Sequence, residues 1–141
     1  MSESTPPPLT DEQLEFLNSL FDLAREGRAE ELMPIIDRGV PVDLTDHKGD
    51  TLLILATYNG HPRLVEDLLR RGADVHRLNA RGQSALTCAV FVQDERSARA
   101  LMVAGADPDA GPQSARAVID MFNLDAMRPL LDTPPAGDTG T

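Results

Sequence analysis

One tripeptide occurs twice in this sequence, and its spacing restricts the fold more than any other feature. Gly72-Ala73-Asp74 returns as Gly105-Ala106-Asp107, and Gly39 stands at the same distance before the first copy. Other pairs of identical or similar residues are separated by the same number of positions: Gly49 and Gly82, Thr51 and Ser84, Leu53 and Leu86, and Ala56 and Ala89. A period of about 33 residues indicates a solenoid, in which each copy buries its apolar side against the next.

Apolar residues at helical spacing, interrupted by glycines, predict two helices in each copy. The expected helices cover residues 10–26, 28–38, 51–59, 62–71, 84–92, 97–104, 117–124 and 126–132. Pro34 lies inside the second of them and removes one hydrogen bond, so we expect that helix to be bent or shortened. The stretches between helix pairs, residues 39–50 and 72–83, predict extended fingers with turns at 46–49 and 79–82.

The domain organisation follows from the same pattern. A chain of 141 residues is long enough for one domain with a modest core. We expect this domain over residues 10–131, with repeats at about 10–45, 46–78, 79–111 and 112–131, the first and last being degenerate. Residues 1–9, which contain three consecutive prolines, and residues 132–141 are expected to be disordered tails.

The two central copies also carry a family pattern. Residues 46–56 have the form Asp-x-x-Gly-x-Thr-Leu-Leu-Ile-x-Ala, followed by Asn-Gly-His and Gly-Ala-Asp, and residues 79–107 repeat most of it. This pattern resembles the ankyrin-repeat family, in the style of small stand-alone bacterial members. The resemblance implies an all-α ankyrin-repeat solenoid of about four helix–turn–helix repeats with β-hairpin-like finger loops. Ile54 and Thr87 replace a histidine that normally links neighbouring repeats, so we expect part of that hydrogen bonding to be missing.

The charge balance limits the partners that the protein can have. The net charge is −10, and such a surplus of acid repels nucleic acid and anionic membranes. Residues 1–31 hold eight acids and two bases, which suggests a partner protein with a basic surface. The sequence shows neither a signal peptide nor an apolar run of about 20 residues. We therefore expect a cytoplasmic location.

The residues that could carry chemistry are few. His47, His61 and His76 lack metal-ligand spacing, and Cys88 is the only cysteine, without a base nearby in the sequence. Phosphate-binding and serine-nucleophile motifs are absent from the sequence. We expect no metal, no cofactor and no catalytic activity, with an uncharacterised enzyme as the least favoured alternative.

The resemblance implies a binding face made of the finger tips and the exposed side of the first helix in each repeat. Carried over by position, it comprises His47, Lys48, Asp50, Tyr58 and Asn59 in the second repeat, Ala80, Arg81, Gln83, Phe91 and Val92 in the third, and Arg25, Glu26 and Leu124 at the ends. Tyr58 and Phe91 occupy equivalent positions. They are either contact residues for a partner or residues that stack on each other or on the capping helices.

The function expected from this face is protein binding. The preferred hypothesis is a monomeric adaptor or regulator that binds one partner protein on the concave and finger side. The alternative is a dedicated inhibitor, or immunity-like protein, that masks a single enzyme. Both hypotheses rest on a rigid surface that is ordered before the partner arrives.

Overall fold

The computed structural model describes residues 9–136, and its regular elements are helical. In chain order they are α1 (Asp11–Glu26), α2 (Ala29–Asp37), α3 (Leu52–Tyr58), α4 (Pro62–Arg70), α5 (Ala85–Phe91), α6 (Glu95–Val103), α7 (Ala115–Phe122) and the 3₁₀ helix η1 (Asp125–Asp132). Residues 1–8 and 137–141, most of the expected tails, lie outside the described range. The 132–141 boundary differs: Asp132 still belongs to η1, and the Ala136 N–H donates to the Val103 carbonyl at 2.6 Å.

Hydroxyl side chains start the first helix of every pair. Thr10, Thr51, Ser84 and Ser114 each accept a hydrogen bond from the backbone N–H three residues further on. These bonds satisfy donors that the first turn of a helix otherwise leaves open. Asp94 does the same for α6, which therefore begins two residues before the expected position. Pro34 does not shorten α2, which is continuous from Ala29 to Asp37.

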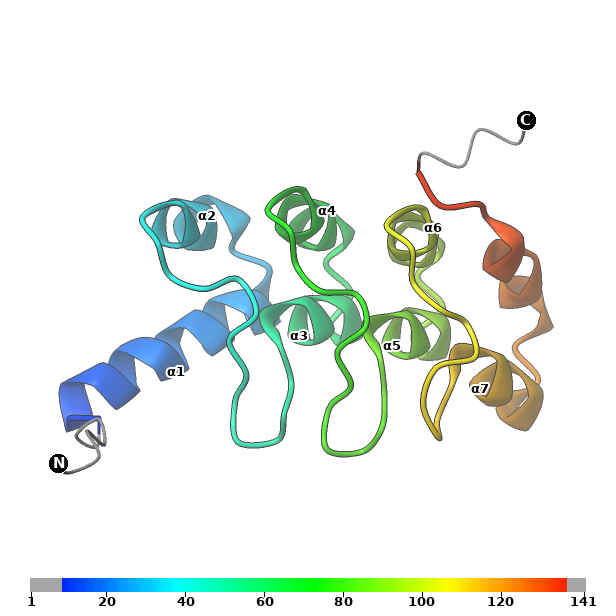
Figure 1. Ribbon diagram of the computed structural model, residues 1–141, viewed down its shortest axis with the longest axis horizontal. Helices are drawn as coiled ribbons and strands as arrows, with labels where there is room; N and C mark the ends of the chain where they lie inside the picture. Colours follow the sequence, from blue (N-terminus) through cyan, green and yellow to red (C-terminus); the bar gives the residue numbers. More distant parts are fainter. Residues whose placement is uncertain (1–8, 137–141) are drawn as a thin grey trace, which may run out of the picture.

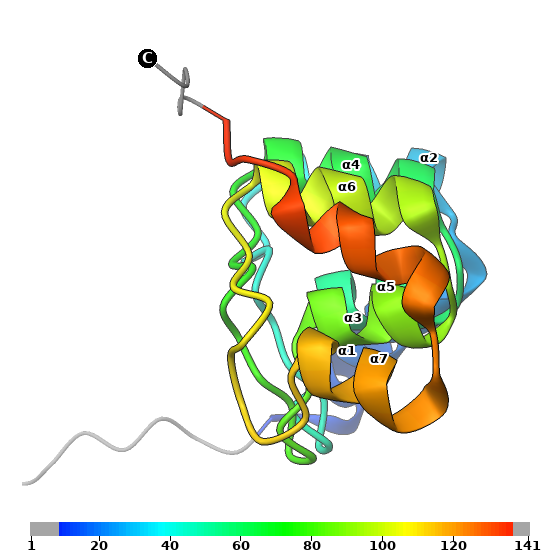
Figure 2. The same cartoon turned by 90° about the vertical axis from the view of Figure 1, so that its right-hand side faces the viewer.

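The helices form two layers that step along one axis (Figure 1). The inner layer contains α1, α3, α5 and α7, and the outer layer contains α2, α4, α6 and η1 (Figure 2). Each inner helix packs on the next inner helix, and each outer helix does likewise. The fully buried side chains lie on both layers and are mostly leucine: Leu20, Leu32, Leu52, Leu53, Leu64, Leu68, Leu86 and Leu101. Each repeat thus buries its apolar surface mainly against its neighbours.

Fingers connect each outer helix to the next inner helix and lie on one side of both layers (Figure 2). The turn glycines Gly49 and Gly82 have φ values of 76° and 75°, and an isolated antiparallel bridge joins Thr45 to Thr51. Hydrogen bonds link one finger to the next. The Ala80 N–H donates to the Lys48 carbonyl, and Gln113 Nε2 donates to the Arg81 carbonyl, both at 2.9 Å.

The positions that lack the expected histidine still contribute to repeat stacking. Thr87 is buried, and its Oγ1 donates to the carbonyl of Gln113 in the next repeat at 2.7 Å. Ile54 is 2% exposed and makes an apolar contribution instead. The expectation of a missing hydrogen bond is therefore wrong at Thr87, because its hydroxyl reaches the neighbouring finger directly.

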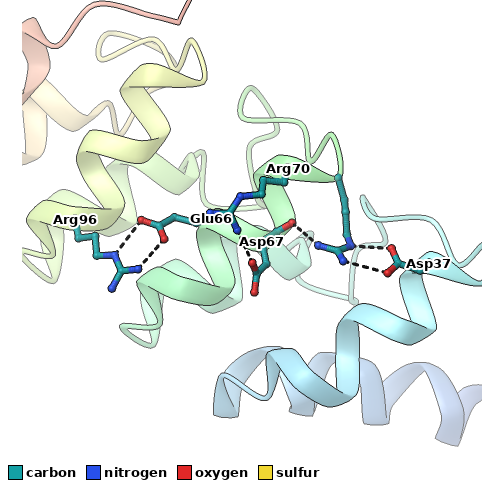
Figure 3. A network of polar contacts seen from close by, with 6 residues as sticks. Asp37, Glu66, Asp67, Arg70 and Arg96 are labelled. Carbon is teal, nitrogen blue, oxygen red and sulfur yellow. Dashed lines mark hydrogen bonds and ion pairs between the residues drawn. The ribbon is translucent and has the colours of Figure 1, made fainter.

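Ion pairs cross the outer layer from α2 through α4 to α6 (Figure 3). Arg71 binds both oxygens of Asp37 at 2.8 and 3.0 Å, and Arg96 binds both oxygens of Glu66 at 2.9 and 2.7 Å. Hydrogen bonds from the two arginines lower the pKa of Asp37 and the pKa of Glu66. Both pairs therefore stabilise the fold above the ordinary carboxyl pKa of about 4, and this contribution is lost as the pH falls through the lowered values.

A close contact joins the first repeat to the second. Gly27 ends α1 in the left-handed conformation, and a Cβ at this position would overlap the ring of His61. The ring lies against this glycine because His61 Nε2 donates to the Arg25 carbonyl at 2.7 Å. His61 thus has a structural role between the two repeats.

We expect Gly27→Ala to lower the free energy of unfolding more than Gly60→Ala. Both glycines have nearly the same φ, 72° and 76°, so both substitutions carry a left-handed backbone penalty of about 1–2 kcal/mol. At Gly27 the new methyl group meets a ring, whereas a Cβ at Gly60 would have no atom within 4 Å apart from its chain neighbours. Urea unfolding of both variants measures the difference. Equal losses would show that the His61 contact adds nothing.

Candidate functional site

The candidate site is the concave face, where the inner helices meet the fingers. Two rows of equivalent side chains run along it. The helix row contains Arg25, Tyr58 and Phe91, each one repeat length from the next, and the finger row contains Lys48 and Arg81. A cavity of about 200 Å³ lies between the rows and is lined by Arg25, Lys48, Tyr58 and Arg81, among others.

The aromatic residues of the helix row are exposed and also stacked. Tyr58 and Phe91 are 47% and 45% exposed, and their rings lie 6.4 Å apart at an interplanar angle of 10°. Phe122, which is 51% exposed, meets Phe91 edge to face at 5.6 Å. The expectation that Tyr58 and Phe91 stack on each other is therefore confirmed, and both residues remain about half exposed. That they contact a partner stays a prediction.

Phe122 is not among the predicted residues, and Leu124 was predicted in this region because the third finger is shorter than the other two. The capping Ser84 lies twelve positions after Gly72, but Ser114 lies only nine positions after Gly105. A strict repeat step therefore places Leu124 beside Phe91. The structure instead has Leu124 partly buried against the core and Phe122 next to Phe91. Counting from the caps, Phe91 lies seven residues after Ser84 and Met121 lies seven residues after Ser114, so this count reaches the residue before Phe122 and does not identify Phe122 itself.

The other predicted residues divide between exposed and structural positions. His47, Lys48, Arg81 and Asn59 are exposed, and Gln83 and Val92 are half-buried. Asp50 is different, because it is 6% exposed and accepts a hydrogen bond from Asn79 Nδ2 at 2.9 Å. The expectation that Asp50 lies at the surface is therefore corrected. Its carboxylate joins the first finger to the second.

Asp46 and Asn79 occupy equivalent turn positions. The first finger has a carboxylate there and the second has an amide, because the groups that they face are different. In both turns the side-chain oxygen Oδ1 accepts from the N–H groups two and four residues ahead. The second branch of the side chain points to the preceding repeat. For Asn79 the group there is the Asp50 carboxylate, which needs a donor. For Asp46 it is Arg25, whose Nη2 lies 3.5 Å from the buried Oδ2.

The reactive groups in this region do not form a catalytic arrangement. Burial raises the pKa of Cys88 to about 12, so its thiol stays protonated and is a poor nucleophile at neutral pH. Among residues 9–136, no group of three or more His, Cys, Asp or Glu side chains is arranged to hold a metal ion. Within the same residues, no helix has the length and apolar character needed to cross a membrane. The concave face carries aromatic, basic and amide side chains.

Comparisons with known proteins agree with this architecture. A family model described as ankyrin repeats, in three copies, matches residues 20–111. A Pseudomonas aeruginosa protein named as an ankyrin repeat protein is 46% identical over 65 residues, covering 46% of this chain and 38% of the relative. An ankyrin repeat-containing protein of Treponema pallidum is 37% identical over 103 residues, covering 70% of this chain and 35% of the relative.

A solved structure shows the same fold. The ankyrin repeat domain of human ASB11 superposes with a TM-score of 0.69 at 25% identity, covering 79% of this chain and 52% of that domain. This chain spans less than two fifths of the length of either bacterial relative, so the likeness concerns the repeats and not the whole of those proteins. The match of the family model over most of the chain, together with the stacked helix pairs and fingers, shows that the protein belongs to the ankyrin-repeat family.

Proposed function

We propose that this protein is a non-catalytic module that binds a partner protein on its concave face. The observation that carries the proposal is the line of three half-exposed rings, Tyr58, Phe91 and Phe122, of which Tyr58 lines the cavity shared with the fingers. Aromatic side chains are common anchors of protein interfaces, and ankyrin repeats generally mediate contacts between proteins. The stacked rings form an apolar strip that a partner can cover.

The hydrogen bonds between fingers support this function because they order the face in advance. The first finger is bound to the second through Ala80 and Asn79, and the second to the third through Arg81 and Gln113. Ring stacking fixes the aromatic side chains in the same way. A partner therefore meets a surface that loses little further conformational entropy, which favours tight binding.

The acidic residues that suggested a basic partner lie mainly away from this face. Asp11, Glu12 and Glu15 belong to the first two turns of α1, which have no counterpart in α3 and extend beyond the stack (Figure 1). Asp22, nearer the face, is paired with Arg25 at 2.8 Å. The acidic side chains of the first repeat can attract a basic patch on a partner as it approaches. They do not determine the chemistry of the partner segment that contacts the concave face.

Tyr58→Ala/Phe91→Ala is expected to weaken partner capture at least about tenfold, because interface anchors each contribute about 1–2 kcal/mol or more. The experiment compares affinity capture from a lysate by the wild type and by this double variant. Leu14→Ala/Phe16→Ala is a matched control, because these side chains are 45% and 47% exposed but lie on the protruding part of α1.

Thermal unfolding separates a binding effect from a folding effect. The Tyr58→Ala/Phe91→Ala protein should melt within a few degrees of the wild type, since one stacked pair contributes about 0.5–1.5 kcal/mol. Equal capture by all three proteins would contradict the proposal. A 1:1 complex in which the partner loses its own activity would identify the dedicated-inhibitor alternative.

A further inference from the structure

The finger row carries positive charge that the chain itself does not neutralise. Among residues 9–136, Lys48 and Arg81 are exposed and form no ion pair, although eight arginines elsewhere do. Within that same range, Arg38, Arg63 and Arg99 also lack an ion pair. Lys48 and Arg81 are the two that stand on finger turns and line the cavity of the concave face.

The two side chains are held in register. Lys48 and Arg81 are the third residues of equivalent turns, and their N–H groups donate to Asp46 Oδ1 and Asn79 Oδ1, each at 2.9 Å. The Lys48 carbonyl in turn accepts from the N–H of Ala80, the residue before Arg81. Their positions along the solenoid are thus fixed by the backbone, and only the side chains remain free to move.

The two acidic residues that line the same cavity, Asp46 and Asp50, already accept hydrogen bonds within the chain. Asp46 accepts from the N–H groups of Lys48 and Asp50 and lies beside Arg25, and Asp50 accepts from Asn79. Both carboxylates are buried, with Asp50 6% exposed and the Asp46 side chain 5% exposed. The exposed charged side chains around the cavity are therefore basic, Lys48 and Arg81 together with the paired Arg25, although the protein as a whole carries −10.

We infer that the partner segment on the concave face is acidic and apolar, with a carboxylate over Lys48 and Arg81 and an apolar side chain over Tyr58 and Phe91. This inference rests on the proposed function and specifies its partner. Arginine binds carboxylates through two parallel hydrogen bonds, and these are stronger than neutral ones. A basic segment would leave Lys48 and Arg81 desolvated beside like charge. The acids of the first turns of α1 are screened over about 8 Å at physiological salt.

The test selects random dodecapeptides, displayed on phage, on the immobilised full chain. We expect the selected pool to be enriched in Asp and Glu together with Leu, Phe, Tyr or Trp, relative to the unselected library. Individual selected peptides, labelled with fluorescein, should bind Lys48→Glu/Arg81→Glu at least about tenfold more weakly than the wild type. Arg63→Glu/Arg99→Glu, with the same charge change on the outer helices, should retain wild-type affinity within about threefold.

Two results would overturn the inference in distinguishable ways. Peptides that require Tyr58 and Phe91 but are neutral or basic, or that bind Lys48→Glu/Arg81→Glu normally, would refute the acidic partner and leave the proposed function standing. A selection without enrichment, or with peptides insensitive to Tyr58→Ala/Phe91→Ala, would refute both. Selection on Lys48→Glu/Arg81→Glu gives a positive check, because its pool should shift to Lys and Arg. Circular dichroism melting confirms that these surface variants are folded.

Discussion

Asn79→Asp is expected to lower the free energy of unfolding by about 3 kcal/mol at pH 7, because it leaves a buried charge without its partner. In the wild type, Asn79 Nδ2 donates to Asp50 Oδ1 at 2.9 Å, and the two residues are 7% and 6% exposed. The substitution replaces this donor by a second carboxylate of nearly the same shape. The two acids then face each other across a gap that excludes most water.

The pH dependence identifies the cause. In the variant, the facing carboxylates hold a proton at pH values where a free carboxyl, with a pKa of about 3.9, is ionised. The pKa of the pair is thus raised in the folded state, so the deficit is absent below about pH 4 and grows as the pH rises through the raised value. Urea unfolding from pH 4 to pH 8 should show the variant approaching the wild type on acidification.

The equivalent turn of the first finger provides the control. Asp46→Asn makes the first finger like the second, but its neighbour is Arg25, whose side chain is 41% exposed and also binds Asp22. We expect this variant to lose less than half as much stability as Asn79→Asp. If Asn79→Asp were as stable as the wild type at pH 7, or equally destabilised at every pH, the account of the finger contact would be wrong.

Leu86→Ala is expected to lower the stability of the whole domain by about 3 kcal/mol, the usual cost of emptying a buried leucine site. Leu86 is fully buried in α5, which packs against α3, α6 and α7. Because each repeat is stable only against its neighbours, a defect in the middle weakens the interfaces on both sides. Hydrogen exchange should speed up in helices of every repeat, and urea unfolding should remain a single transition.

Ile119→Ala removes a side chain that is equally buried but lies in α7, at the end of the described stack. The cavity left by Ile119→Ala therefore weakens the interface between α7 and α5, on one side only. Exchange should therefore speed up in α7 and η1, while α3 and α5 keep nearly wild-type protection from solvent. Identical exchange patterns in the Leu86→Ala and Ile119→Ala proteins would mean that the repeats unfold as one indivisible unit.

The sequence predicted the stacked helices well because period, caps and apolar spacing are local signals. Thr51 and Ser84 cap helices as expected, and Gly27 ends the first one. The parts that it did not predict depend on pairing between distant residues. Nothing in the composition of residues 46–50 shows that Asp50 has a donor in the next finger. The sequence around Thr87 likewise does not show that its hydroxyl donates to the carbonyl of Gln113 in the next repeat.

The candidate site was predicted in outline but not in detail. Equivalent positions identified Tyr58, Phe91, Lys48 and Arg81, because the repeat places them in rows. The last repeat escaped this reasoning because its shorter finger moves the position equivalent to Phe91 from Leu124 to Met121, and the ring that meets Phe91 belongs to the next residue, Phe122.

The first finger has an aspartate, Asp46, where the second has an asparagine, Asn79. This difference determines which repeat can be duplicated to lengthen the solenoid by protein engineering. Duplicating residues 46–78 in tandem would set the aspartate of the second copy against Asp50 of the first, carboxylate to carboxylate. Duplicating residues 79–111 would instead set an asparagine against Gln83, an amide to an amide. We therefore expect that the third repeat can be inserted in several tandem copies. Tandem copies of the second repeat should be stable only when they also carry Asp46→Asn.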